Sequence, residues 1–197
     1  MRSRPRVRRA LAAAIAVAVL AGAPQAASVV APSFDAMVTR ARAVFVGQTV
    51  DVRSQWVSTP SGRAIVTIVT FKVLRTLKGE LGAQTQLEFL GGTVGEYRME
   101  IPGMPKFRVG DEDVLFVDER GQPVSPVVGF MHGRFRVLED PGTGRRSVAR
   151  YNFEPLAGVA EIGTAAPAPR VASARALSLA AFEDEIVRAV RRQPQVR

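Results

Sequence analysis

The segment Gly91 to Phe107, GGTVGEYRMEIPGMPKF, lies between two stretches with the pattern of β-strands. A glycine-rich loop binds phosphate when a Lys and a Ser or Thr follow the glycines and a helix begins directly after them. Here Glu96 follows the glycines and no helical pattern comes next, which argues against a phosphate site. We expect a chain reversal in which glycines adopt positive φ and prolines form rigid corners. The positions expected to have this structural role are Gly91, Gly92, Gly95, Pro102, Gly103 and Pro105.

Other candidates for catalysis or metal binding are few. The chain has one histidine, His132, and no cysteine, which excludes thiolate zinc sites, thiol nucleophiles and His-rich metal centres. The acidic run from Asp111 to Asp113 lacks EF-hand spacing, and acids that flank an apolar strand are commonly solvated. No serine lies in a G-x-S-x-G elbow. The sequence therefore predicts no catalytic residue, no metal site and no cofactor.

The first residues have the layout of a secretory signal peptide. The cationic stretch MRSRPRVRR precedes an apolar run from Ala10 to Ala23, and small residues follow it. That run is too short to span a bilayer, which needs about 20 residues. We expect cleavage between Ala26 and Ser28 and no integral membrane span afterwards. The mature protein is predicted to be exported, either to a periplasm or out of the cell.

The net charge argues against a nucleic-acid partner. The chain has 27 Lys+Arg and 18 Asp+Glu, and the leader removes five arginines and no acid, so the net charge falls from +9 to +4. A net charge of +4 is low for a protein that binds along a nucleic-acid backbone, which is a polyanion. Phe71, Phe89, Phe116 and Phe135 also fall at core positions of the predicted strands, which leaves fewer aromatic rings to stack on bases. We therefore predict no nucleic-acid binding.

Hydrophobic periodicity predicts a mainly β protein with a helix near each end. Ser33 is placed to cap a short helix that ends near Ala41, and Ser178 to cap an amphipathic C-terminal helix. Between them, period-2 alternation and turn residues indicate a small antiparallel barrel or sandwich. Gly47 is expected to form a bulge in the first strand. The predicted strands are 43–57, 63–79 (paired with the first around TPSG), 85–90, a short one at 96–101, 114–117, 126–131, 134–139 and 147–152.

The composition divides the chain into four segments. Residues 1–26 are the predicted signal peptide, 27–160 the β-domain, 161–176 an Ala/Pro linker and 177–192 the C-terminal helix. We expect the apolar stripe of this helix to dock on the β-domain, since its acids disfavour an anionic membrane surface. Docking on a membrane or a partner remains the alternative.

Three segments carry a resemblance to known domains. VFVGQTVDV, TFKVLRTLKG and FRVGDEDVLFV are similar to the netrin-like modules and tissue inhibitors of metalloproteinases. This resemblance, from Ala43 to Val137, implies a small OB-like antiparallel barrel with flanking helices. The chain also resembles a group of exported bacterial proteins of uncharacterised function that carry LGGTVG and a later PGmP motif. The inhibitors chelate zinc through an N-terminal cysteine, which is absent here, so that mechanism does not carry over.

These observations predict an exported, non-enzymatic protein-binding or inhibitor-like module whose partner is another exported protein. An exposed loop on a rigid scaffold is a common location for binding residues. A hydrolytic or metal-dependent enzyme of the cell envelope, using His132 or Asp111, and a structural envelope protein remain alternatives. The sequence leaves open the oligomeric state and whether the apolar loop residues fold back on the domain. The residues expected to bind the partner are Glu96, Tyr97, Arg98, Met99, Ile101, Met104, Lys106 and Phe107.

Overall fold

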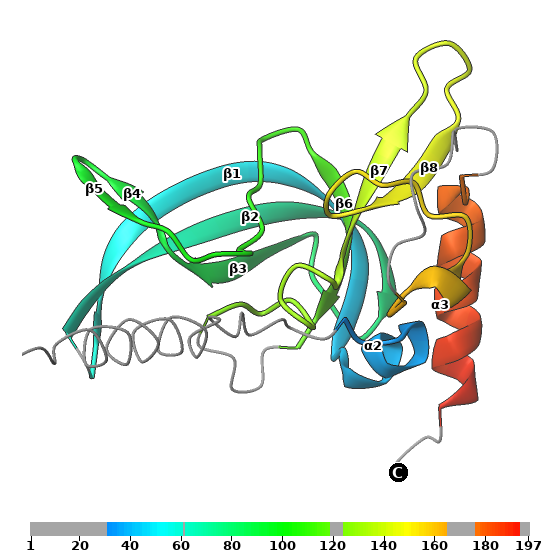
Figure 1. Ribbon diagram of the computed structural model, residues 1–197, viewed down its shortest axis with the longest axis horizontal. Helices are drawn as coiled ribbons and strands as arrows, with labels where there is room; N and C mark the ends of the chain where they lie inside the picture. The colour runs from blue at the N-terminus through cyan, green and yellow to red at the C-terminus, as the bar shows by residue number, and fades with distance from the viewer. Residues whose placement is uncertain (1–30, 61, 119–123, 165–175, 194–197) are drawn as a thin grey trace, which may run out of the picture.

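The computed structural model describes residues 31–60, 62–118, 124–164 and 176–193. The predicted signal peptide and residues 165–175 of the predicted linker lie outside the described residues. The fold is mainly β, with a short helix near the N-terminal end and a longer one near the C-terminal end, as the sequence predicts. The two helices lie at one end of the sheet and a small β-hairpin lies at the other (Figure 1).

Six antiparallel strands form one sheet in the order β3-β2-β1-β6-β7-β8. A separate hairpin is formed by β4 and β5, within the glycine-rich segment. The strand bounds are β1 Ala43–Thr59, β2 Gly62–Lys78, β3 Gln84–Leu90, β4 Gly92–Val94, β5 Tyr97–Met99, β6 Glu112–Val117, β7 Arg134–Glu139 and β8 Arg146–Arg150.

This sheet is open, so the expected closed barrel needs correction. Closure would require the edge strand β8 to pair with β3 at the opposite edge. The outer edge of β8 is instead occupied by nearby chain, because Val148 N donates to Leu177 O at 2.9 Å and Arg150 N donates to Glu154 O at 2.8 Å. These bonds satisfy backbone groups that barrel closure would otherwise satisfy.

A long bent hairpin of β1 and β2 forms the centre of the sheet. The register shifts between Val46 and Gly47, which confirms the bulge expected at this glycine. A Cβ atom on Gly47 would lie 2.6 Å from the Phe45 ring, so only glycine permits this close packing. The bulge also keeps Phe45 in edge-on contact with Phe71 of β2, with ring centroids 5.9 Å apart.

Both predicted helices are present, with the predicted caps. The helix α2 (Phe34–Arg40) begins after Ser33, whose Oγ accepts from Ala36 N at 3.3 Å. The helix α3 (Leu179–Arg192) begins after Ser178 in the same way. The apolar face of α3 is buried against the sheet and α2, as predicted. Neither helix is long and apolar enough to cross a membrane.

Alternation along the strands divides the core between the two faces of the sheet. Val44 and Phe116 face the helices, whereas Phe45 and Leu115 face the opposite side. On that opposite side the glycine-rich segment supplies much of the cover, including Phe107.

One predicted strand is wrong. Residues 126–131 form only a single bridge, between Val127 and Val117, and then turn. Gly129 and Phe130 have φ of +64° and +66°, and two successive residues in this region bend the chain out of an extended conformation. A period-2 apolar pattern does not reveal such a turn.

Candidate functional site

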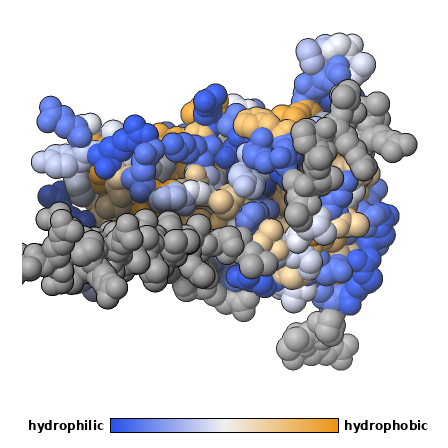
Figure 2. Space-filling model, in the orientation of Figure 1, coloured by the Kyte–Doolittle hydropathy of each residue, from blue (hydrophilic) through white to orange (hydrophobic). Residues whose placement is uncertain are grey.

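The segment from Leu90 to Phe107 passes over one face of the sheet and encloses a pocket of about 530 Å³. Its floor consists of alternate residues from three neighbouring strands. Ser54 pairs with Thr67 and Val52 with Val69 across β1 and β2, so all four side chains project from one face. In the space-filling view, hydrophobic surface shows between hydrophilic side chains over the half of the molecule that carries β4 and β5 (Figure 2).

The N-terminal end of this segment is fixed to the floor by hydrogen bonds. Gly91 N donates to Ile65 O at 2.7 Å, and Thr67 Oγ1 donates to Gly91 O at 2.7 Å. Gly92 has a φ of +141°, and a Cβ atom there would lie 2.4 Å from the oxygens of both Ser54 and Thr67. Adjacent glycines therefore allow the backbone to approach this hydroxyl pair closely.

The other glycines and prolines shape the remainder of the segment. Gly95 has a φ of +60° and lies at the turn between β4 and β5. Met104 N donates to Ile101 O at 3.1 Å, which closes a β-turn with Pro102 second and Gly103 third, at a φ of +78°. This is the residue order of a type II turn. Pro105 follows it and lines the pocket.

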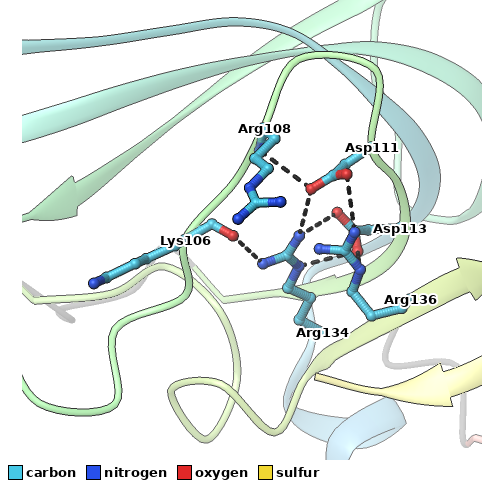
Figure 3. Close-up of polar contacts among 6 residues, drawn as sticks. All are labelled: Lys106, Arg108, Asp111, Asp113, Arg134 and Arg136. Atoms are coloured by element: carbon cyan, nitrogen blue, oxygen red, sulfur yellow. Dashed lines mark hydrogen bonds and ion pairs between the residues drawn. The ribbon is translucent and has the colours of Figure 1, made fainter. Parts of the chain in front are cut away.

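A buried ion-pair network fixes the C-terminal end (Figure 3). Arg134 donates from Nε and Nη2 to the two oxygens of Asp113, at 3.0 and 2.9 Å. Its Nη1 donates to the carbonyl oxygen of Lys106 at 2.6 Å, and its guanidinium lies 4.0 Å from the centroid of the Phe107 ring. Arg134 therefore ties β6 and β7 to the segment that covers the pocket.

Two more charged residues complete the network. Arg136 Nη2 lies 2.9 Å from Asp111 Oδ1, and the other oxygen of Asp111 accepts from Arg108 N at 3.2 Å. Asp113 is fully buried, and burial raises its pKa, while Arg134 and then Arg136 oppose that rise. The expectation that these acids are solvated is wrong for Asp113. Arg134 and Arg136 on the adjacent strand β7 compensate its charge, and the sequence pattern of β6 alone does not show them.

Three charged side chains stand where the pocket opens to solvent. Glu100 accepts a hydrogen bond from Arg98 and another from Lys106, the latter at 3.1 Å. The bond from Arg98, and next that from Lys106, lowers the pKa of Glu100. The mouth thus combines two cations with one carboxylate, and all three residues line the pocket.

The structure distributes the residues expected to bind a partner over three environments. Glu96, Tyr97, Arg98 and Lys106 are exposed, whereas Met99, Ile101 and Met104 line the pocket. Phe107 is only 8% exposed. Its ring centroid lies 5.3 Å from that of Phe71 and 5.0 Å from that of Phe89, so it belongs to the core.

At the tip of the hairpin, Tyr97 contacts Trp56, which in turn contacts Arg63, and the binding residues expected from the sequence include neither of these two. Its ring packs edge-on against Trp56 of β1 at 5.5 Å, and the guanidinium of Arg63 lies 4.6 Å from the centroid of the Trp56 ring. We call Trp56, Arg63 and Tyr97 the tip cluster. The hairpin pairing around TPSG places Trp56 opposite Ile65 and therefore near Arg63. This predicted pairing was the feature of the sequence that could have identified the contact between Trp56 and Arg63.

The candidates for catalysis remain apart from this pocket or are engaged elsewhere. The His132 ring packs edge-on against Tyr151 at 5.6 Å. Within the described ranges, no group of three or more His, Asp or Glu side chains is placed to hold a metal ion. No protein-family model, curated protein or solved structure matches this chain.

Proposed function

We propose that this protein is an exported, non-enzymatic, inhibitor-like binding module that acts on another exported protein through its tip cluster. The observation that carries the proposal is the exposure of Tyr97, which is 66% exposed although its ring packs against Trp56. Trp, Tyr and Arg are the residues most enriched in binding hot spots. The tip cluster contains one of each.

The hairpin is also fixed before any partner arrives. The bonds of Gly91 to Ile65 and Thr67 hold one end of the covering segment, and Arg134 holds the other through Lys106 O. A surface that is already ordered loses less conformational entropy on binding than a flexible loop does. This favours tight binding through a small number of contacts.

Charged neighbours of the tip would add specificity. Glu96 and Arg98 flank Tyr97 in the chain and are both exposed. Exposed charges at the rim of an interface select partners and steer association more than they raise affinity.

The netrin-like resemblance supports the same kind of function. OB-type folds are partly open Greek-key barrels. An open antiparallel sheet in which β1 pairs with both β2 and β6 is compatible with that description. The predicted export signal is the reason to expect a partner outside the cytoplasm.

The alternatives have less support. The carboxylates that a hydrolase would use near the pocket, Asp111 and Asp113, are engaged by Arg134 and Arg136. The stripe of α3 that could contact an envelope component is packed against the sheet, with Glu183 paired to Arg75.

The proposal is tested by affinity capture from the exported fraction with the mature protein as bait. Tyr97→Ala should lose a partner that the wild type retains, by about 30-fold in affinity if Tyr97 is a hot spot worth about 2 kcal/mol. Val109→Ala is the matched control, because Val109 is 67% exposed and lies outside the tip cluster. Recovery of the same partners at the same level by all three baits would contradict the proposal.

A further inference from the structure

The pocket beneath the covering segment is distinct from the tip cluster and has the character of a small-molecule site. Its volume of about 530 Å³ lies inside the range of about 300–1,000 Å³ typical of ligand pockets. Such sites combine apolar walls with a few polar groups that orient the ligand. The apolar residues that line this pocket are Val52, Val69, Phe89, Leu90, Met99, Ile101, Pro102, Met104, Pro105 and Phe107.

The hydroxyl groups on the floor are already paired. Thr67 Oγ1 donates its proton to Gly91 O, and Ser54 Oγ lies 2.9 Å from Thr67 Oγ1. The proton of Ser54 is therefore used in the bond to Thr67, so neither of these two floor hydroxyls has a proton left for a ligand. Such a floor suits an aliphatic chain better than a sugar or a nucleotide, whose many polar groups would lose their hydrogen bonds on burial.

The charges at the mouth favour an anion. Among the described residues that line the pocket, Arg98 and Lys106 are basic and Glu100 alone is acidic. Glu100 is paired with both cations, yet Arg98 and Lys106 remain mostly exposed, at 64% and 79% of their side-chain surface. An incoming carboxylate would therefore meet a net positive mouth.

We infer that this pocket binds a free alkanoate, with its aliphatic chain along the apolar walls and its carboxylate at Arg98 and Lys106. Glu100 competes with the ligand for these two cations. The inference goes beyond the proposed protein-binding function, and of the residues proposed there to contact the partner it shares only the rim residue Arg98. Either one can fail while the other holds.

The first measurement is isothermal titration calorimetry of the mature protein with octanoate, decanoate and dodecanoate, below their micelle concentrations. Each step of two methylenes should raise affinity roughly 15-fold, because one buried methylene contributes about 0.8 kcal/mol. Dodecyltrimethylammonium is the cationic control and should bind at least tenfold more weakly. Absence of alkanoate binding, independence of chain length, or equal affinity for the cation would each overturn the inference.

Variants locate the site. Val50 and Val52 lie on β1 and are each 37% exposed, but only Val52 lines the pocket. Val52→Trp should reduce decanoate affinity at least tenfold, and Val50→Trp should leave it unchanged. Unchanged binding by folded Val52→Trp would refute the location.

A second set of variants changes the charged residues at the mouth of the pocket. These residues are exposed, so this test does not require the fold to accommodate a new tryptophan. Glu100→Gln should raise decanoate affinity several-fold, because it removes the competing carboxylate, and Arg98→Gln should lower it. Weaker binding by Glu100→Gln would overturn the assignment of the head group. Capture of a protein partner by Val52→Trp provides the separate test of the tip cluster, which this change leaves intact.

Discussion

Replacement of Arg134 by methionine removes the cation that joins the strands to the covering segment. Arg134 is 3% exposed and makes a two-bond contact with Asp113, which is fully buried. Methionine fills a similar volume without charge. Asp113 would then retain only Arg136, whose Nε lies 3.4 Å from it.

The expected loss follows from the burial of the pair. Removal of one partner of a buried ion pair costs about 3–5 kcal/mol, because the other charge stays buried without compensation. Arg136 compensates Asp113 in part, so we expect a loss of about 3 kcal/mol from this source. The Arg134→Lys variant retains the positive charge but not the two-pronged guanidinium group. Its free energy of unfolding should therefore fall by less than that of Arg134→Met.

The assay is equilibrium unfolding in urea, followed by the fluorescence of Trp56, the single tryptophan of the chain. With a slope of about 2 kcal/mol per M, a loss of about 3 kcal/mol lowers the midpoint by about 1.5 M. Circular dichroism should give the same midpoint if the transition is two-state.

A double-variant cycle supplies the decisive comparison. Arg134→Met combined with Asp113→Leu should cost at least about 2 kcal/mol less than the sum of the two single changes, since an apolar pair replaces a buried ion pair at little net cost. A single change that costs under about 1 kcal/mol, or strictly additive costs, would refute the view that this pair is tightly coupled.

Three further predictions concern stability. Gly92→Ala should cost about 2–4 kcal/mol in urea unfolding, because its φ is +141° and its Cβ would meet two hydroxyl oxygens, whereas Gly95→Ala, with open space around it, should cost about 1. Phe107→Ala should cost about 3–5 kcal/mol, since the ring is buried in the core, and a loss below about 1 would contradict that placement. The pKa of Asp140 is lowered, chiefly by the hydrogen bond that its carboxylate accepts from the backbone N–H of Thr143. The stability due to the Asp140 charge is therefore present above the unfolded pKa of about 3.9 and is lost as pH falls through the lowered folded value, so wild type and Asp140→Asn should converge in free energy of unfolding from pH 5 to pH 3. A constant difference over that range would contradict the assignment.

Most of the secondary structure was predictable because its signals are local. Ser33 and Ser178 cap their helices through bonds to N–H groups three residues away. The alternation in β2 and β3 and the turn at TPSG are equally short-range, and the predicted hairpin follows from them. The strand predicted at 126–131 failed because a pattern of apolar residues does not record the positive φ of Phe130.

The candidate site was predictable only in its chain position. The sequence indicated the segment from Gly91 to Phe107 and the glycines and prolines that shape it. It did not show that Phe107 belongs to the core, or that Met99 and Met104 face a pocket while Tyr97 stands at the tip. Those assignments depend on which side of the segment faces the sheet.

The sequence by itself determined most of the strands and the two capped helices, since each arises from neighbours in the chain, and the export signal stays a prediction. Only the tertiary structure decided the partners of the buried charges and the cover of the pocket. Arg134 reaches Asp113 across 21 residues of chain and Lys106 across 28. Contacts at such separation depend on the order of strands in the sheet and on how the covering segment folds back. Loop closure by itself permits many alternative contacts at a similar cost in chain entropy, and packing selects one of them.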